Sequence, residues 1–309
     1  MIDILYSAYP GSWEEYRAPL RDALAEAGLN VNLATEHAAE DVRYIVYSPG
    51  GPVSDFSTFT NLRAVLSLWA GVEGVVGNPT LKVPLARMVD PGMKQGMTDY
   101  VVAHVMRHLL NLDVHIRQQD GVWRQAPPPM ASERRVGILG LGELGRAVGQ
   151  ALKGLGFAVS GWSRSPKSVE GIACESGDDG FARVLETSDF LVLLLPHTSE
   201  TEAVIDARAL ARMKKGAALI NPGRGPLIDD DALVAALDRG HLSHATLDVF
   251  RQEPLPKEHR FWSHPKITVT PHIAAYTRPS TSARVIAENV RRAEAGEPLL
   301  HLVDRDAGY

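Results

Sequence analysis

Short apolar runs alternate along the chain with longer segments in which apolar residues recur every three or four positions. In the first third, strand-length runs cover residues 2–6, 42–46 and 64–69, and the helical period covers 13–27, directly before Gly28. Glycine suits the position after a helix because it adopts a left-handed backbone without strain. Alternation of this kind is typical of βαβ units and predicts a small parallel sheet covered by helices.

The same alternation resumes after a long helical stretch, which the pattern predicts to run from an N-cap at Thr98 to about residue 119. Further strand-length runs follow at 136–139, 158–162, 190–195, 217–221, 245–249 and 267–270, and a last helix is predicted over 279–296. The run at 190–195 is apolar throughout, as expected of a parallel strand that is buried on both faces. The pattern therefore predicts an α/β protein with doubly wound parallel sheets.

Composition and charge exclude several classes of protein. The chain has 309 residues, of which 45% are hydrophobic, and a formal charge of −5. This length favours two domains, and a mildly acidic balance without a basic block argues against nucleic acid as a partner. We expect no membrane partner and no signal peptide, because no apolar run approaches the roughly 18 residues of a span and the N-terminus has no basic region. The single cysteine, Cys174, excludes an internal disulfide and fits a reducing compartment, which we expect to be the cytoplasm.

A glycine-rich turn joins the apolar run at 136–139 to the next helix. It contains Gly140, Gly142, Glu143, Leu144 and Gly145. The first glycine permits the tight turn, the second lets the backbone approach a pyrophosphate, and the third lets helix and strand pack closely. The helix that follows points its free N–H groups and positive dipole end at the phosphates. We predict a dinucleotide-binding Rossmann turn; the alternative is a strand–helix turn without a ligand.

The next strand does not end in the acid that usually binds the ribose 2′-hydroxyl of NAD. Ser163 occupies that place and is followed by Arg164 and Ser165. A carboxylate would repel a 2′-phosphate, whereas a guanidinium presents a planar fork that binds one. These three residues therefore predict NADP(H) as the preferred cofactor, with NAD(H) as a second cofactor. The alternative for Arg164 is a solvated surface arginine.

Three downstream segments carry a cation, a carboxylate and an imidazole, in that order: Arg224, Glu253 and His272. A guanidinium binds a carboxylate bidentately, and an imidazole titrates near neutral pH and can donate a proton. A carboxylate on the second ring nitrogen fixes the tautomer and stabilises imidazolium. These are the groups needed to reduce a 2-oxo acid. Each residue alone is more often structural or solvated, so the hypothesis rests on their joint occurrence.

The order and local sequence of these motifs resemble those of the D-isomer-specific 2-hydroxyacid dehydrogenases. The resemblance is close over residues 62–278 and loose before them. Within that family, the segments at 161–165 and 253–256 are most similar to the glyoxylate/hydroxypyruvate reductase A group. The resemblance implies that Arg224 binds and polarises the 2-oxo acid, that Glu253 pairs with His272, and that His272 is the acid–base. It implies an NADPH-dependent reductase that converts glyoxylate to glycolate and hydroxypyruvate to D-glycerate.

The resemblance also implies further binding residues. Those flanking the cofactor are Leu195, Pro196, Pro222, Gly223, Asp248 and Ala274, with Asp248 near the nicotinamide. The segment 67–73 resembles the loop whose backbone amides hold the substrate carboxylate, which makes Trp69, Ala70 and Gly71 the substrate-binding residues. Trp69 stands where the family has a glycine. It would narrow the pocket and favour small substrates; the alternative is a packing role.

The family likeness implies a domain organisation and an assembly. It places a Rossmann cofactor domain at 98–279 and a smaller, flavodoxin-like substrate domain at 1–97 and 280–309. The segment 111–124 resembles a dimerisation arm, so we expect a homodimer.

Several competing interpretations stay open. The fold alone would also suit a non-catalytic dinucleotide-sensing protein, a reductase of larger 2-oxo acids, or a phosphoglycerate dehydrogenase. His104 and His108 have the i, i+4 spacing of zinc ligands, but no third ligand is evident, so we predict no metal site. His241 and His244 are expected to face solvent.

Overall fold

The chain folds as two units in the computed structural model, which describes residues 1–308. One unit comprises Met1–Met93 together with the chain from Thr277 onward, and the other comprises Lys94–Tyr276. The sequence predicted that the chain passes from one domain to the other after residue 97 and returns after residue 279. Among the described residues, no helix is both long and apolar enough to cross a membrane. The two units are called unit 1 and unit 2 below.

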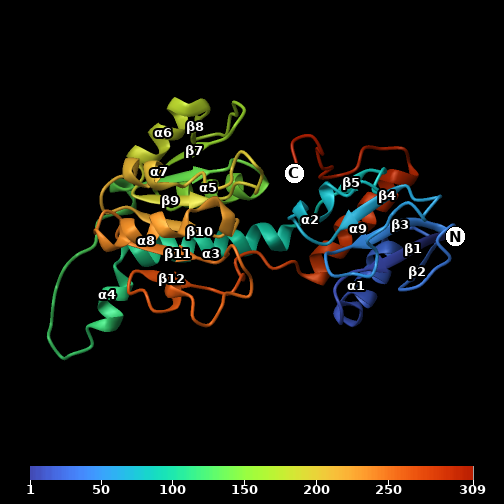
Figure 1. Ribbon diagram of the computed structural model, residues 1–309, viewed down its shortest axis with the longest axis horizontal. Coiled ribbons are helices and arrows are strands. Elements are labelled where there is room, and N and C mark those ends of the chain that lie inside the picture. Colours follow the sequence, from blue (N-terminus) through green and yellow to red (C-terminus); the bar gives the residue numbers. More distant parts are fainter. Residues whose placement is uncertain (309) are drawn as a thin grey trace. The chain divides into compact units, whose positions relative to one another are not determined.

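Unit 1 is built on a five-stranded parallel sheet with the order β2-β1-β3-β4-β5. Its strands are β1 (Ile2–Ser7), β2 (Val31–Ala34), β3 (Val42–Tyr47), β4 (Ala64–Ser67) and β5 (Leu85–Ala86). Its helices are α1 (Ser12–Glu26), α2 (Glu73–Val76) and α9 (Pro279–Glu294), and α1 packs against α9 (Figure 1). This strand order is the flavodoxin-like one, so the predicted class of the smaller sheet is confirmed.

The end of α1 follows from its sequence. Gly28 has φ 72°, and the amide of Leu29 donates to the carbonyl of Leu24 at 3.1 Å. This is the Schellman arrangement, which a left-handed glycine permits and which satisfies a carbonyl of the last turn. The two edge strands of unit 1, β2 and β5, were not predicted, because β2 has only one buried residue and β5 has only two residues.

Unit 2 is built on a seven-stranded parallel sheet with the order β12-β11-β10-β9-β6-β7-β8. Its strands are β6 (Arg135–Leu139), β7 (Ala158–Trp162), β8 (Ala173–Glu175), β9 (Phe190–Leu193), β10 (Ala218–Asn221), β11 (His244–Leu247) and β12 (Ile267–Val269). Its connecting helices are α5 (Glu143–Gly154), α6 (Gly177–Thr187), α7 (Ala207–Arg212) and α8 (Asp230–Asp238), with short 3₁₀ turns at Ala131–Glu133, Gly225–Leu227 and Arg260–Trp262. The predicted doubly wound parallel sheets are therefore confirmed.

The strand order of unit 2 reverses between β6 and β9, which pair in parallel from Val136 opposite Phe190 to Leu139 opposite Leu193. At such a switch point, the connections that follow the two adjacent strands run to opposite sides of the sheet. Ligands of doubly wound sheets bind at the carboxyl ends of the strands there. β9 is buried at every position, as its unbroken apolar run predicted. The topology thus puts the glycine turn and the segment after β9 on the two sides of this point.

The long helix of unit 2 was predicted with the wrong ends. α3 spans Pro91–Leu109, crosses from unit 1 into unit 2, and is followed by the separate short helix α4 (Leu112–Arg117). The side chain of Asp90 accepts from the amides of Gly92 at 2.7 Å and Met93 at 3.2 Å, so Asp90 caps the helix ahead of Pro91. Thr98 is no N-cap, since its hydroxyl donates to the carbonyl of Lys94 within the helix. The left-handed residue Asn111 separates α3 from α4.

Two histidines expected in solvent lie instead against the protein. His241 contacts the carbonyl of Met213 at 2.9 Å, and His244 contacts Thr268 at 2.9 Å. His244, the first residue of β11, also faces the ring of His108 on α3 with centroids 5.1 Å apart. The expectation was wrong because His241 finds a backbone carbonyl after α7, and His244 finds a hydroxyl on β12 and a ring on α3. Periodicity does not reveal such partners.

Candidate active site

The glycine turn has room for a ligand at one position only. Gly140 has φ 110°, and a Cβ there would lie 2.5 Å from the carbonyl oxygen of Leu194. A Cβ at Gly145 would collide with the carbonyl of Gly140. Gly142 directly precedes α5, and nothing lies within 4 Å of the Cβ it lacks. Gly140 and Gly145 are therefore required by packing, whereas Gly142 leaves open space at a helix N-terminus, which is what a pyrophosphate needs.

The first residues of α5 are tied to their surroundings. Glu143 accepts from Lys94 at 2.6 Å and also pairs with Arg146. The hydrogen bond from Lys94 is the main reason that the pKa of Glu143 is lowered. Leu144 packs against the apolar core that includes Ile138 and Val148. Both residues thus fix the orientation of the helix N-terminus.

The segment after β7 brings two cations to this end of the sheet. Ser163 is buried, and its hydroxyl donates to the carbonyl of Ser165 at 2.8 Å. Arg164 forms an ion pair with Glu200 at 3.0 Å, in which both side chains are more than half exposed. Lys167 donates from its amine to the carbonyl of Leu141 at 3.0 Å, so this cation lies over the glycine turn itself. Lys167 was not among the predicted cofactor-binding residues, although it is a second cation only three residues after Arg164.

The segment after β9 packs against the glycine turn. The amide of Leu194 donates to the carbonyl of Leu139 at 2.7 Å, and Leu195 is buried. The carbonyl of Pro196 accepts from the hydroxyl of Thr201 at 2.7 Å. The imidazole of His197 lies 2.6 Å from the carboxylate of Glu202. Leu195 and Pro196, predicted to flank a cofactor, thus lie at the switch point of the sheet.

Arg224 lies in a loop that is folded tightly at the end of β10. The buried side chain of Asn221 donates to the carbonyl of Arg224 at 2.8 Å and accepts from the amide of Gly223 at 3.1 Å. A Cβ at Gly223 would lie 2.7 Å from the carbonyl of Leu193, and one at Gly225 would collide with the backbone at Phe250. Pro222 is buried in the same turn. The two glycines therefore allow the loop to lie against its neighbours and leave the side chain of Arg224 partly exposed.

Asp248 fastens the loop that carries His272. Its carboxylate is fully buried and accepts three hydrogen bonds, from the hydroxyl of Thr270 at 2.6 Å and from the amides of Ile273 at 2.9 Å and Ala274 at 2.8 Å. Its carbonyl accepts from the amide of His272 at 2.9 Å. Hydrogen bonds to both carboxylate oxygens fix the orientation of the side chain. The contacts of Asp248 are thus structural, a role that the sequence did not suggest.

His272 and Glu253 form an imidazole–carboxylate pair. Nδ1 of His272 lies 2.7 Å from one carboxylate oxygen of Glu253, and the other oxygen accepts from the amide of Phe250 at 2.8 Å. Because an ionised carboxylate only accepts, Nδ1 carries a proton and Nε2 is the nitrogen that can exchange one. His272 has φ 54°, a left-handed backbone that a non-glycine residue adopts only when its surroundings require it. Its side chain is 55% exposed.

The three predicted catalytic residues all belong to unit 2. Arg224, Glu253 and His272 follow β10, β11 and β12, which are consecutive neighbours in the sheet. Because parallel strands end at the same edge, the three loops lie side by side. The topology thus places the loop of a guanidinium and the two loops of a paired imidazole and carboxylate at the same edge of the sheet.

The predicted substrate loop belongs to unit 1, where it follows β4. The amide of Trp69 donates to the hydroxyl of Ser67 at 3.0 Å, and its carbonyl accepts from the amide of Met88 at 3.0 Å. The indole is 42% exposed and tilts against Tyr9 with ring centroids 6.4 Å apart. Ala70 and Gly71 continue the loop and are partly exposed.

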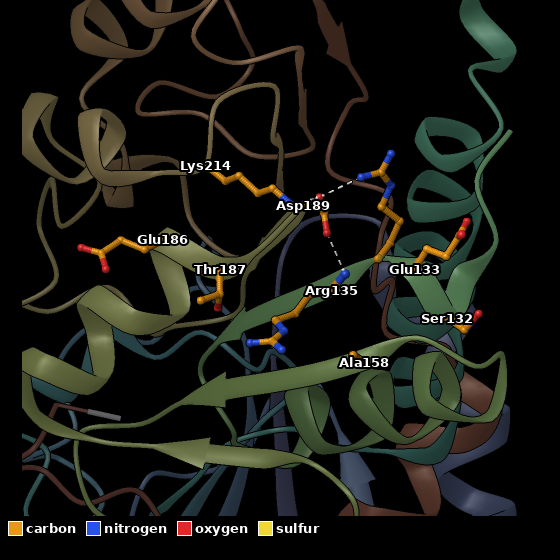
Figure 2. A pocket seen from close by; sticks show the side chains of 9 residues that line it. Ser132, Glu133, Arg135, Ala158, Glu186, Thr187, Asp189 and Lys214 are labelled. Atoms are coloured by element: carbon orange, nitrogen blue, oxygen red, sulfur yellow. Dashed lines mark hydrogen bonds and ion pairs between the residues drawn. The ribbon is translucent and has the colours of Figure 1, made fainter.

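A cavity of about 430 Å³ lies at the opposite, amino edge of the unit 2 sheet and holds none of the predicted site residues. At its centre, Asp189 accepts from Lys214 at 2.6 Å, from the amide of Arg135 at 2.9 Å and from the side chain of Arg134 at 3.3 Å (Figure 2). Burial raises the pKa of Asp189, but the bonds from Lys214 and Arg135 outweigh it and the pKa is lowered. Asp189, Lys214 and Arg134 pair with one another, so we assign this cluster a structural role.

The two parallel sheets, the glycine turn at a switch point and the paired imidazole define a dehydrogenase-like α/β protein. Residues 100–274 match the model of the D-isomer specific 2-hydroxyacid dehydrogenase NAD binding domain. A glyoxylate/hydroxypyruvate reductase A of Serratia proteamaculans is 37% identical over 304 residues, which cover 96% of each chain. The chain belongs to the D-isomer specific 2-hydroxyacid dehydrogenase family, as its motifs indicated.

Solved structures agree with this membership. A D-isomer specific 2-hydroxyacid dehydrogenase of Xanthobacter autotrophicus Py2, in complex with NADPH and MES, is 40% identical with a TM-score of 0.93 and 99% of each chain covered. An NADPH-dependent glyoxylate/hydroxypyruvate reductase of Sinorhizobium meliloti, in complex with NADP and sulfate, is 32% identical with a TM-score of 0.87 and complete coverage of both chains.

Proposed function

We propose that the protein is an NADPH-dependent reductase of small 2-oxo acids, which converts glyoxylate to glycolate and hydroxypyruvate to D-glycerate. The observation that carries the proposal is the His272–Glu253 pair at 2.7 Å, in which Glu253 lies on the loop next to that of Arg224. The names of the relatives in Serratia proteamaculans and Sinorhizobium meliloti support the substrate class.

In the proposed mechanism, Arg224 binds the substrate carboxylate and polarises the ketone. The guanidinium suits this role because it offers parallel N–H donors to two oxygens. Nε2 of His272 donates a proton to the ketone oxygen, and Glu253 stabilises the imidazolium before transfer and holds the ring through Nδ1. The bound nicotinamide cofactor supplies the hydride that C2 receives. The ketone thereby gains one hydride and one proton and becomes a secondary alcohol.

For the cofactor, we propose that Arg164 and Lys167 bind the 2′-phosphate of NADPH, with NADH as a weaker second cofactor. The ion pair of Arg164 with Glu200 is largely exposed, and such pairs contribute only about 0–1 kcal/mol. A doubly charged phosphate can therefore take the guanidinium from Glu200. The amine of Lys167 already lies over the glycine turn, at 3.0 Å from the carbonyl of Leu141. Complexes of the relatives with NADPH and NADP support this assignment.

We further propose that unit 2 is the cofactor domain and unit 1 the substrate domain, in which Trp69, Ala70 and Gly71 contact the 2-oxo acid. The family model that matches residues 100–274 is described as NAD binding, which supports the first assignment.

We propose a homodimer that uses the segment 111–124 as an arm. After α4 this segment loops away from the sheet of unit 2 (Figure 1) and exposes large apolar side chains, among them Ile116, Val122 and Trp123, the last 90% exposed. Apolar side chains gathered in this way are typical of protein interfaces. Size-exclusion chromatography with light scattering tests the dimer. The free thiol of Cys174 supports a reducing compartment, and we propose the cytoplasm.

The first experiment is to follow nicotinamide absorbance with glyoxylate, hydroxypyruvate and phenylpyruvate, each with NADPH and with NADH. Fast oxidation of NADPH by the two small acids is expected. A preference for phenylpyruvate would contradict the proposed substrate, and a preference for NADH would contradict the proposed 2′-phosphate site. Tight NADPH binding without turnover of any acid would favour a dinucleotide-sensing protein.

A further inference from the structure

Arg251 joins three loops at the carboxyl edge of the unit 2 sheet. It lies between Asp248 and Glu253 in the loop after β11, and its side chain is 38% exposed. Nη2 donates to the carbonyls of Ile228 at 2.6 Å and Pro226 at 3.2 Å, in the loop after β10. Nη1 donates to Glu202 at 2.6 Å, in the loop after β9. One planar guanidinium thus spans segments that are distant in the sequence.

The loop of Arg224 is held on both sides through these contacts. Before Arg224, the side chain of Asn221 bonds to the carbonyl of Arg224 at 2.8 Å. After it, Arg251 holds the carbonyls at Pro226 and Ile228, and the carbonyl of Pro226 also accepts from the amide of Ala203 at 2.8 Å. Without the guanidinium of Arg251, the part of the loop after Arg224 would lose these side-chain contacts, and the contact from Asn221 before Arg224 would remain.

The same residue lies next to the imidazole–carboxylate pair along the chain. Glu253 follows Arg251 in one short loop, in which the amide of Phe250 also donates to Glu253 at 2.8 Å. A shift of Arg251 would therefore move Glu253, and with it the ring of His272 that Glu253 holds at 2.7 Å.

Glu202 is the counterion that keeps Arg251 in place. Hydrogen bonds from Arg251 and then His197 lower the pKa of Glu202, so it is ionised at neutral pH. Its two oxygens are divided between the partners, one accepting from Arg251 and the other lying 2.6 Å from Nε2 of His197. The chain His197–Glu202–Arg251 therefore runs from the segment after β9 to the loop of Glu253.

We propose that Arg251 is a positioning residue of the reduction, which fixes the loop of Arg224 relative to the His272–Glu253 pair, with Glu202 as its anchor. The inference rests on the proposed function, because it assigns those three residues to one reaction. Displacing reacting groups by about 1 Å can lower the rate by roughly 10²-fold. Arg251 itself touches neither substrate nor cofactor in this role.

The test compares Arg251→Met, Arg251→Lys and Glu202→Gln with the matched control Arg212→Met. Arg212 also pairs with a glutamate in unit 2, Glu186, at 3.0 Å and is 56% exposed, but it lies on α7 away from the site loops. We expect Arg251→Met to lower kcat for glyoxylate by about 10- to 100-fold, with NADPH affinity unchanged within about twofold. We expect Arg251→Lys to recover part of the loss, because an amine replaces one arm of the fork. Glu202→Gln should lower kcat less than Arg251→Met does, and Arg212→Met should leave kcat unchanged.

A second measurement does not depend on turnover. The amides of Ala203, Ile205 and Asp229 donate between the loops after β9 and β10, so their hydrogen exchange reports the contact that Arg251 holds. We expect faster exchange of these amides in Arg251→Met, with the β9 and β10 strands unchanged.

The outcomes separate the two proposals. An active wild type with wild-type kcat and exchange in Arg251→Met would overturn the positioning role and leave the proposed function intact. An equal loss in Arg212→Met would also overturn it, because the effect would then be general. A wild type that reduces no 2-oxo acid contradicts the proposed function and the kinetic part of this inference, while the exchange measurement still decides whether Arg251 holds the loops.

Discussion

The two edges of the unit 2 sheet hold similar side chains in opposite ways. At the amino edge, Asp189 is surrounded by donors, and His244 and the neighbouring His108 are withdrawn from solvent. At the carboxyl edge, the side chain of His272 is 55% exposed, and of its two ring nitrogens only Nδ1 has a hydrogen-bond partner within residues 1–308. Charged residues and histidines occur at both edges and therefore do not identify the site. A ring nitrogen without a hydrogen-bond partner, as in His272, identifies it better.

The difference extends to the backbone. The loops of the carboxyl edge depend on buried polar side chains, such as Asn221 and Asp248, and on a left-handed His272. In the cavity of the amino edge, by contrast, the carboxylate of Asp189 is paired with Lys214 and Arg134 (Figure 2). Strain held in place by buried hydrogen bonds is typical of functional sites. Substitutions should thus affect activity at one edge and stability at the other.

The largest effect is expected for His272→Asn. Asparagine tolerates a left-handed backbone better than most residues, so the loop should keep its shape. Loss of the general acid should lower kcat by roughly 10²–10⁴-fold. Steady-state kinetics with glyoxylate measure the loss, and fluorescence titration of NADPH should give an unchanged dissociation constant. A wild-type kcat in His272→Asn would show that the carboxyl edge does not supply the general acid.

At the amino edge, Asp189→Ala should affect stability and leave kcat unchanged. The side chain is only 12% exposed, and its removal leaves Lys214 and the amide of Arg135 without their acceptor. Losing such a buried partner costs about 2 kcal/mol, which thermal unfolding would detect as a lower Tm. The control is Glu186→Ala, whose carboxylate is 51% exposed and should change little. A lower kcat with an unchanged Tm in Asp189→Ala would contradict the structural role assigned to the amino edge.

Acid should destabilise the amino edge through its histidines. Burial, with His244 and Arg107 beside it, lowers the pKa of His108 to about 3, and burial and Arg107 lower that of His244 to about 4, both from an ordinary value of 6.5. Below pH 6.5 the unfolded chain binds protons that the folded one does not, so stability falls with pH until the folded values are reached. Tm should therefore decrease from pH 7 to pH 4.5. His244→Gln should flatten this dependence, and an unchanged slope would show that other groups cause it.

The smallest effect is expected for Arg164→Ser. Its exposed pair with Glu200 contributes little to folding, so Tm should not change. Losing one charge-assisted bond to a 2′-phosphate should reduce the preference for NADPH over NADH by about tenfold. Lys167→Ser is the companion variant, and kcat/KM for each cofactor is the measurement. An unchanged preference in both variants would place the phosphate elsewhere.

The sequence predicted the strands of the fold where the apolar run was unbroken. Strands such as β9, which is buried throughout, were found from apolar runs alone, because a parallel strand covered on both faces has no polar position to interrupt it. β2, β5 and β8 were missed because they lie at sheet edges, where β2 has one buried residue, β8 has none and β5 has only two residues. The start of α3 was missed at Asp90 and Pro91, although a cap followed by proline is a local feature of helix starts.

The candidate site was predictable only as a set of residue types. The sequence placed Arg224, Glu253 and His272 after successive strands, and adjacency follows from the topology. It did not indicate the supporting contacts, such as Asp248 with Ala274 or Arg251 with Ile228, because these join loops through backbone groups. Backbone amides and carbonyls are the same at every residue, so no sequence pattern marks them.

Unit 1 is made from the two outer parts of the chain, with α9 packed against α1 and Glu294 bonded to Tyr44 at 2.6 Å. On the ribosome, the strands β1–β5 emerge early, but the helix that covers α1 is synthesised after the whole of unit 2. Unit 2 is one continuous segment and can fold as soon as it has left the exit tunnel. Unit 1 thus begins before unit 2 in the order of synthesis but is completed after it.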